Sequence, residues 1–339
     1  MKRIGYGIVG TGRISDWVLK GAVQDPRFQA VAICSRSEEK AYSFVSAHPG
    51  AFIPGARIYT SVDDMVRDPE VEAVYIGTPN STHYPYTMAA LAAGKHVLCE
   101  KPAACNAAEL RDMLEASRRN GCCFMEAMIS TLNPNFVTAR SRIPEIGPVR
   151  HFSSSFCQYS SKYDALRKGE VSNSFNPAMG GGALADIGVY TTFPAVALFG
   201  RPQSVKSNLV NFPTTFGDTD VQGTVELGYP GMTAVLSFSK VVDSHLPTEI
   251  CGEGGNILLD AVHICRRVEF APHAAPSSGR GPSAGREILA EGLPMDEYYY
   301  EFKEFMDVIE SGKIESEVNS HEVSMVNREI MDEIKTQNI

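Results

Sequence analysis

Residues 8–15 read Ile8-Val9-Gly10-Thr11-Gly12-Arg13-Ile14-Ser15, a short apolar run that breaks into glycines and then resumes with helical spacing. This pattern predicts a strand, a phosphate-binding turn and a helix. Such a turn needs one glycine for the tight bend, a second so that backbone can approach a pyrophosphate, and a small third residue for close helix–strand packing. Gly10, Gly12 and Ser15 stand at these positions, although Gly or Ala is usual at the third. The helix would direct its N–H groups at the phosphates. The residues predicted to bind a dinucleotide here are Gly10, Thr11, Gly12, Arg13 and Ile14.

The first 125 residues alternate short apolar runs with amphipathic stretches, which is typical of parallel β-α units. In the first helix, Ile14, Trp17, Val18 and Ala22 recur at three- and four-residue spacing and make one apolar face. Strands are expected at residues 4–9, 28–34, 71–76, 96–99 and 122–127, and helices at 14–22, 38–47, 86–93 and 106–120. The alternation predicts an α/β domain with a doubly wound parallel sheet over residues 1–125.

From about Val149 the pattern changes to consecutive strand-like runs, which indicate a largely antiparallel sheet. Strands are expected at residues 149–157, 205–212, 220–228 and 233–240, and helices at 182–198, 295–311 and 320–336. Residues 271–286 are rich in Ala, Pro, Ser and Gly and are expected to be a mobile loop. We therefore predict a second domain over residues 126–339.

Composition restricts the possible functions. A chain of 339 residues is longer than those that usually form a single hydrophobic core, so two domains are expected. The net charge of −9 argues against a general affinity for nucleic acid or an anionic membrane. The eight cysteines form no CxxC pair or CxxxH cluster, so we expect no metal site, no disulfide framework and a reduced, cytoplasmic protein. We also expect no signal peptide, and no apolar run reaches transmembrane length.

Ser35 and Arg36 directly follow the second expected strand. An NAD-specific protein usually places Asp or Glu there to hold the ribose 2′-hydroxyl, whereas NADP requires Arg and small hydroxyls around a 2′-phosphate. The pair therefore favours NADP over NAD. The alternative interpretation is a solvated arginine at the start of a helix.

Two further loops follow expected strands: Gly77-Thr78-Pro79-Asn80, with His83 close behind, and Glu100-Lys101-Pro102. In an open α/β sheet, the loops at the carboxyl ends of the strands form the ligand crevice. His83 has the alternative of a structural or surface group, and Lys101 that of a surface lysine paired with Glu100. The residues predicted to contribute to the cofactor site are Thr78, Pro79, Asn80, His83, Glu100 and Lys101.

Three residues are candidates for proton transfer. Pro102 restricts the backbone of Lys101 to extended geometry, and a lysine that is partly desolvated beside a cofactor can exchange protons near neutral pH. Asp186 and Tyr190 follow Gly180-Gly181-Gly182 and lie four residues apart, on one helical face. The glycines would let backbone approach a ligand, and a carboxylate with a phenol suits a hydroxyl or carbonyl group. Alternatively, Asp186 is a cap and Tyr190 a core residue.

In order and spacing, these motifs resemble those of one family, the Gfo/Idh/MocA group of glucose-fructose oxidoreductase, inositol dehydrogenase and rhizopine-catabolism proteins. The resemblance covers nearly the whole chain. It implies an N-terminal Rossmann domain and a C-terminal α/β domain with a large open sheet, whose outer face often supports dimers or tetramers. The motifs that carry it are residues 10–14, residues 77–80 with His83, residues 100–102, and residues 181–190.

The resemblance also implies an activity. Members commonly transfer hydride between a nicotinamide and a carbon that bears a hydroxyl or carbonyl, usually on a sugar or polyol. Lys101 matches their usual catalytic group, whose bond to the following proline is often cis. Tyr190 stands where inositol dehydrogenase-like members carry His, and it is more similar to the xylose dehydrogenase and dihydrodiol dehydrogenase branches, many of which use NADP. Residues 129–134 depart from the aromatic residues and arginine of relatives, so the substrate cannot be carried over.

We therefore predict an NADP(H)-dependent oxidoreductase whose small-molecule substrate is a sugar, polyol or cyclic diol. Lys101 would donate or accept the proton of the reacting oxygen, Tyr190 would orient or share it, and Asp186 would hold a hydroxyl. A homodimer or homotetramer through the C-terminal sheet is expected, with no nucleic-acid or membrane partner. Two alternatives remain open: a sensor that binds NADP without turnover, and an enzyme that uses tightly bound nicotinamide transiently in lyase or glycosidase chemistry.

Overall fold

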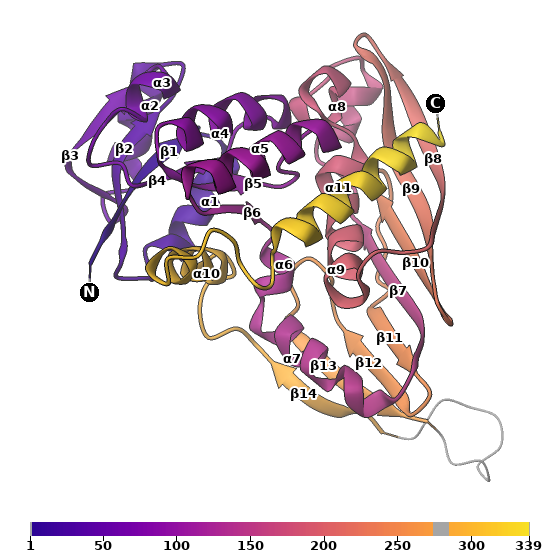
Figure 1. Cartoon of the computed structure of the whole chain (residues 1–339). Coiled ribbons are helices and arrows are strands. Elements are labelled where there is room, and N and C mark those ends of the chain that lie inside the picture. The colour runs from indigo at the N-terminus through magenta and orange to yellow at the C-terminus, as the bar shows by residue number, and fades with distance from the viewer. Residues whose placement is uncertain (1, 274–284, 339) are drawn as a thin grey trace. The chain divides into compact units, whose positions relative to one another are not determined.

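The computed structural model describes residues 2–273 and 285–338, and Figure 1 shows the elements that they form. The chain forms two compact units. The first consists of Met1–Ile129 with Met295–Arg328, and the second of Ser130–Pro294 with Glu329–Ile339. This division differs from the predicted one at residue 125, because a C-terminal segment returns to the first unit.

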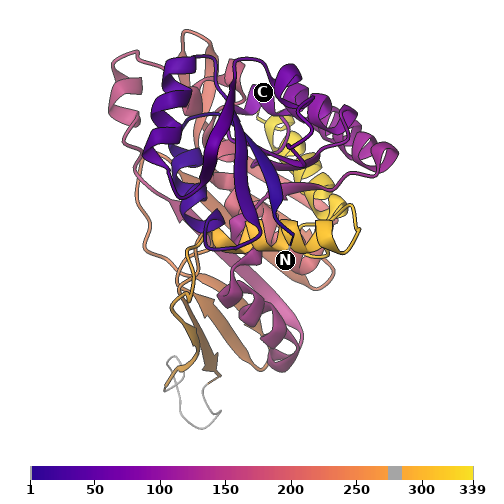
Figure 2. The same cartoon turned by 90° about the vertical axis from the view of Figure 1, so that its left-hand side faces the viewer.

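A six-stranded parallel sheet forms the centre of the first unit, in the order β3-β2-β1-β4-β5-β6. Figure 2 shows its strands and the helices that flank them. The order is that of a doubly wound dinucleotide-binding sheet, which confirms the predicted fold class. β3 was not predicted, because Pro54 and Gly55 interrupt its apolar run. The elements are β1 (Ile4–Val9), α1 (Arg13–Ala22), β2 (Phe28–Cys34), α2 (Glu38–Ala47), β3 (Phe52–Tyr59), α3 (Val62–Met65), β4 (Ala73–Ile76), α4 (His83–Ala92), β5 (His96–Glu100), α5 (Ala107–Asn120), β6 (Phe124–Ala127) and α10 (Tyr299–Glu310).

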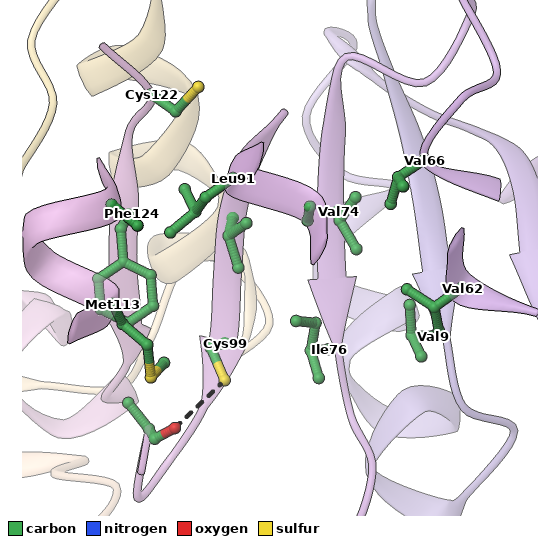
Figure 3. Packing of buried hydrophobic residues seen from close by; sticks show 14 of the residues in the cluster. Val9, Val62, Val66, Val74, Ile76, Leu91, Cys99, Met113, Cys122 and Phe124 are labelled. Atoms are coloured by element: carbon green, nitrogen blue, oxygen red, sulfur yellow. Dashed lines mark hydrogen bonds between the residues drawn. The ribbon is translucent and has the colours of Figure 1, made fainter. Parts of the chain in front are cut away.

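Apolar side chains of this sheet pack against those of the covering helices. In Figure 3, Ile76 of β4 and Cys99 of β5 lie in one layer with Leu91 of α4 and Met113 of α5. None of these four side chains has more than a trace of exposed surface. Because helices cover both faces, the strands read as continuous apolar runs rather than as alternating ones.

Helix α10 packs on the first unit although it comes some 170 residues after β6 in the sequence. The ring of Phe302 lies 5.7 Å from that of Tyr6 and 5.6 Å from that of Phe28. A Cβ added to Gly21 of α1 would lie 2.3 Å from the backbone nitrogen of Tyr299, so the two helices touch through backbone. These contacts explain why the unit includes a C-terminal segment.

A buried arginine completes this attachment. Arg27 donates to Asp25 at 2.7 Å, to Asp307 of α10 at 2.7 Å and to Glu310 at 2.9 Å. Burial raises the pKa of Asp25, but the hydrogen bonds from Arg27 outweigh it and hold this pKa below its usual value. The cluster therefore couples the start of β2 to α10.

An eight-stranded mixed sheet forms the second unit, in the order β14-β13-β12-β11-β7-β10-β9-β8. Among the described strands of this sheet, only β7 and β10 pair in parallel, which confirms the predicted, mostly antiparallel sheet. Sequence patterning missed the last four strands, which are short. Of the loop predicted at residues 271–286, residues 271 and 272 end β13, and residues 274–284 lie outside the described residues. The strands are β7 (Val149–Cys157), β8 (Ser204–Thr214), β9 (Gly217–Tyr229), β10 (Met232–Ser239), β11 (Thr248–Gly252), β12 (Gly255–Leu259), β13 (Arg267–Pro272) and β14 (Glu287–Glu291).

The predicted helix at residues 182–198 consists of a π-helix, η5 (Leu184–Gly188), that continues into α9 (Val189–Phe199). Residues Pro177–Phe199 are long and apolar enough to cross a membrane by length and composition alone, but 72% of the apolar 18-residue stretch within them is buried. Gly188 lets η5 approach the sheet, since a Cβ there would lie 3.0 Å from the Phe238 ring. The segment is therefore a core helix. The other helices are α6 (Ile129–Leu132), α7 (Pro134–Arg142), α8 (Tyr163–Arg167) and α11 (His321–Thr336).

Replacing Arg27 tests the attachment of α10. Arg27→Met is expected to lower the free energy of unfolding of the first unit by about 3 kcal/mol, because removing one member of a buried ion pair typically costs about 3–5 kcal/mol. Urea unfolding followed by the fluorescence of Trp17, the single tryptophan, measures this unit. Arg67→Met, which breaks an exposed pair with Asp64, is the control and should cost less than about 1 kcal/mol.

The Arg27 effect should also depend on pH. A carboxyl with a depressed pKa stabilises the fold above the unfolded-state pKa, about 3.9 for Asp, and loses this contribution as the pH falls through the folded-state value. The difference between wild type and Arg27→Met should therefore shrink in acid. Equal losses for Arg27→Met and Arg67→Met, or a difference that grows in acid, would contradict the account.

Candidate active site

The turn between β1 and α1 has the geometry of a phosphate-binding loop. Gly10 has φ of +104°, and a Cβ there would lie 2.5 Å from the carbonyl oxygen of Gly77, so only glycine fits. Gly12 is the N-cap of α1, whose first-turn N–H groups lie outside the helix's own hydrogen-bond ladder. Thr11 and Arg13 retain exposed surface. The loop can therefore hold an anion at the helix N-terminus.

The third small position is filled by Ser15, which is completely buried. A Cβ added to Gly77 would lie 2.9 Å from the Ser15 hydroxyl oxygen, so α1 and the end of β4 approach closely. Ile14, the last predicted residue of the turn, is half-buried beside it. Serine thus satisfies the packing requirement that usually selects Gly or Ala.

The ends of the neighbouring strands meet at this loop. The Gly10 N–H donates to the Cys34 carbonyl of β2 at 3.0 Å, and the Gly77 N–H donates to the Val9 carbonyl at 2.9 Å. Beyond β2, Ser35 is half-buried and Arg36 is exposed, directly before the start of α2. The structure therefore brings the predicted phosphate loop and the predicted 2′-phosphate residues to one edge of the sheet.

His83, one of the predicted cofactor residues, lies between two loops of this edge. It is completely buried, with Nδ1 3.0 Å from the Pro102 carbonyl oxygen and Nε2 2.9 Å from that of Thr78. Burial lowers the pKa of His83. Its ring thus ties the loop after β4, where Thr78, Pro79 and Asn80 are half-buried, to the loop after β5, and it presents no surface to a ligand.

Glu100 is buried, whereas its neighbour Lys101 is half-buried. The Tyr75 hydroxyl donates to Glu100 Oε1 at 2.9 Å, and the Lys101 N–H donates to Oε2 at 3.3 Å. Burial raises the pKa of Glu100, although the Lys101 charge opposes this. The Lys101–Pro102 peptide bond is cis, as the family resemblance implies. Glu100 therefore anchors the backbone that presents Lys101 to the edge.

Two further buried glutamates lie in the same unit and were missed by sequence patterning. Glu126 of β6 accepts from the Ala103 N–H at 3.0 Å, just beyond Pro102. Glu301 of α10 is also buried, and burial together with the Glu100 charge raises its pKa well above the usual value. Glu301 could be found only by knowing that α10 packs on the first unit, and the local sequence does not show this packing.

In the second unit, Asp186 lies on η5 and is 37% exposed at its side chain. Its Oδ2 atom accepts from Lys240 Nζ at 2.6 Å. Lys240 directly follows β10 and is almost completely buried. Sequence patterning missed this partner, and the only signal is a lysine at the end of an apolar strand.

Tyr190 is half-buried on α9 and belongs to an aromatic cluster. The rings of Phe156 and His263 stack with centroids 4.0 Å apart and planes inclined by 2°. Tyr190 meets both edge to face, at 5.6 Å and 6.4 Å. Burial lowers the pKa of His263 to about 4, so its ring is neutral at physiological pH. The cluster therefore fixes the orientation of the Tyr190 ring.

The three glycines before η5 serve the fold of their own unit. A Cβ on Gly181 would lie 2.5 Å from the Asn173 carbonyl oxygen, and one on Gly182, at φ +125°, would lie 2.1 Å from Asp220 Oδ1. The Asp220 carboxylate accepts from the Leu184 N–H at 2.5 Å. The close approach predicted for a ligand is thus made by the chain itself, and Asp220 caps η5.

The predicted cofactor residues and Lys101 belong to the first unit, and Asp186 and Tyr190 to the second. Within the first unit, the loops after β1, β2, β4 and β5 lie at one sheet edge, as expected from parallel strands. Within the second, Asp186 and Tyr190 lie one turn apart.

Comparisons with known proteins agree with this fold and these motifs. Residues 4–128 match the profile described as "Oxidoreductase family, NAD-binding Rossmann fold", and residues 136–258 match the Gfo/Idh/MocA C-terminal domain. The chain is 40% identical to a scyllo-inositol 2-dehydrogenase (NADP(+)) of Bacillus subtilis, over 98% of this chain and 97% of that one. It is 29% identical to a trans-1,2-dihydrobenzene-1,2-diol dehydrogenase of Bos taurus, over 97% and 95%.

A solved structure has the same fold. The aldose-aldose oxidoreductase of Caulobacter crescentus superimposes with a TM-score of 0.84 at 22% identity, over 99% of this chain and 97% of that one. Both domain profiles occur here in the family's order, and the relatives match along nearly the whole length. The resemblance inferred from the motifs is confirmed, and this chain belongs to the Gfo/Idh/MocA family of oxidoreductases.

Proposed function

We propose that this protein is an NADP(H)-dependent oxidoreductase that transfers hydride between the nicotinamide and a hydroxyl- or carbonyl-bearing carbon of a sugar, polyol or cyclic diol. The observation that carries this proposal is Lys101, which is half-buried at the ligand edge of the first sheet and is presented there by a buried, anchored Glu100. The names of the relatives, an NADP(+)-dependent inositol dehydrogenase and a dihydrodiol dehydrogenase, support the same reaction class and cofactor.

The residues at this edge fit a dinucleotide phosphate. The N-terminus of α1 beyond Gly12 would receive the pyrophosphate, because its first-turn N–H groups are available and its dipole favours an anion. Ser35 and the exposed guanidinium of Arg36 would hold the 2′-phosphate. The bound cofactor supplies the hydride chemistry, and the protein supplies orientation and proton transfer.

Lys101 would move the proton of the reacting oxygen. The Glu100 carboxylate fixes the Lys101 backbone by accepting a hydrogen bond from the Lys101 N–H, while Lys101 itself stays half-buried. His83 ties this loop to the loop of Thr78, so we assign it a positioning role rather than contact with the cofactor. The loops after β4 and β5 would then keep a fixed position relative to each other.

Asp186 and Tyr190 would complete the reaction from the second unit. Tyr190 presents a phenol that Phe156 and His263 orient, and it would share the proton with Lys101. Asp186, whose side chain is 37% exposed, would accept a hydrogen bond from a substrate hydroxyl. These neighbours suit a substrate with an apolar ring face and several hydroxyls.

We also propose a cytoplasmic homo-oligomer that uses the eight-stranded sheet. All eight cysteines lie among the described residues and none forms a disulfide there, which fits a reducing compartment. Along β7, half-exposed Ser153, Ser155 and Cys157 alternate with buried Phe152 and Ser154, so one face of the sheet retains accessible surface. That face is available for a second copy of the chain.

A substrate panel tests the proposed activity. Scyllo-inositol, D-xylose and trans-1,2-dihydrobenzene-1,2-diol, each with NADP⁺ or NAD⁺, are expected to include at least one pair that generates reduced nicotinamide at a steady rate, with NADP⁺ preferred. Tight cofactor binding without turnover of any such compound would instead support a sensor.

Lys101→Met tests the proton-transfer role. The substitution is expected to lower kcat at least about a hundredfold, since positioned acid–base groups typically contribute about 10²- to 10⁴-fold. NADPH binding and thermal unfolding should be unchanged. Lys313→Met, which removes an exposed lysine of the same unit, is the control and should retain full activity. Near-wild-type turnover by Lys101→Met would reject the assignment.

Arg36→Ala tests the cofactor assignment. A charge-assisted hydrogen bond contributes about 1.5–3 kcal/mol, so the Kd for NADPH should rise about 10- to 100-fold while that for NADH stays the same. Titration of cofactor fluorescence measures both values. Arg119→Ala, at an exposed position of α5, should change neither. If Arg36→Ala leaves NADPH affinity intact, Arg36 is only a surface residue.

A further inference from the structure

Lys240 carries a buried ammonium group, and removing such a charge from water costs free energy. Its side chain is only 3% exposed. Its surroundings include the apolar cluster of Leu166, Phe175 and Val221, and its Nζ lies 3.9 Å from the centroid of the Phe175 ring. A charge in such a place is retained only where it is paired and hydrogen-bonded.

Two partners of this ammonium are Asp186 itself and Ser174, whose carbonyl oxygen also bonds to the start of the Asp186 segment. Nζ donates to Asp186 Oδ2 at 2.6 Å and to the Ser174 carbonyl oxygen at 3.0 Å. The same carbonyl accepts from the Gly182 N–H at 3.1 Å, and the Gly182 carbonyl accepts from the Asp186 N–H at 3.0 Å. Lys240 therefore closes a ring of contacts that fixes both the backbone and one carboxylate oxygen of Asp186.

The backbone of Lys240 is held as firmly as its side chain. Its N–H donates to the Val221 carbonyl oxygen at 2.9 Å, next to Asp220 in β9. Asp220 in turn caps η5 through the Leu184 N–H. One strand, β9, thus holds both the backbone of Lys240 and the start of η5, so the Lys240 ammonium has a fixed position relative to Asp186.

We propose that Lys240 is a positioning and specificity residue for the substrate: it holds the Asp186 carboxylate in one orientation and neutralises its charge. The proposal rests on the proposed function, in which Asp186 accepts a hydrogen bond from a substrate hydroxyl. Oδ2 is committed to the buried ammonium, while 37% of the Asp186 side chain stays exposed for the ligand.

The pair also carries a preference for uncharged substrates. Asp186 and Lys240 together contribute no net charge, so the partly exposed Asp186 side chain offers an acceptor for a neutral hydroxyl without an added attraction for a cation. An uncompensated carboxylate at the same place would attract an ammonium group. Lys240 should therefore favour polyols over the corresponding amino-polyols.

A double-mutant cycle tests whether Lys240 acts through Asp186. Lys240→Met, Asp186→Asn and the double variant are assayed with NADP⁺ and the best substrate of the panel above. Each single variant is expected to lose at least tenfold in kcat/KM, with most of the change in KM, and the double variant should fall within about twofold of Asp186→Asn alone, because coupled residues are non-additive. Lys206→Met, an exposed lysine of the same sheet, is the control and should behave as wild type.

A charged competitor gives a second readout that a purely structural role would not move. Scyllo-inosamine should inhibit Lys240→Met more strongly than the wild type. Its inhibition constant should be at least threefold lower for the variant. Lys240→Arg, which keeps the charge, should recover most of kcat/KM. NADPH affinity should be unchanged in every variant, since the proposed cofactor residues belong to the first unit.

The outcomes separate this inference from the proposed function. If Asp186→Asn keeps full kcat/KM, the substrate role of Asp186 is wrong. If Asp186→Asn is impaired while Lys240→Met is normal, or if the double variant multiplies the two losses, Lys240 has no positioning role. Should Lys240→Met fail to fold, the comparison of the double variant with Asp186→Asn decides, and failure of all Lys240 variants to fold would make the lysine purely structural.

Discussion

The close approach of two loops at one edge of the parallel sheet is the constraint on which the site depends. Gly10 has no room for a Cβ because the Gly77 carbonyl lies against it, and Gly77 has none because of Ser15. The Gly10 N–H donates to Cys34 of β2 and the Gly77 N–H donates to Val9 of β1, and these two bonds hold the strand ends in register. The N-terminus of α1 therefore lies at the strand ends, and the close packing of Gly10, Gly77 and Ser15 keeps it in place.

In both units, buried polar groups hold candidate site residues in place. In the first, Tyr75 and Lys101 satisfy the Glu100 carboxylate, and His83 ties the loops after β4 and β5. In the second, a buried lysine satisfies Asp186. In each case, a half-exposed candidate group is presented by a residue with almost no exposed surface. We interpret these buried partners as the rigid support that proton transfer and hydroxyl recognition require.

Local sequence was sufficient where the structure is local. The first two strands have their predicted bounds, and the Gly10 turn needs only its own glycines. It was insufficient where contacts are distant: α10 joins the first unit through Tyr6 and Arg27, nearly 300 residues earlier, and Lys240 meets Asp186 across 54 residues. The roles of the predicted site residues stay predictions, because they depend on bound ligands.

Hydride transfer itself is the central claim, and isotope tracing measures it most directly. A polyol substrate deuterated at the carbon to be oxidised is incubated with the protein and NADP⁺, and the nicotinamide is examined by NMR. The account predicts one deuterium at C4 of the reduced nicotinamide ring and an oxidised product that has lost it. Deuterium that returns to the organic product without net NADPH, or bound cofactor that never acquires deuterium, would contradict it.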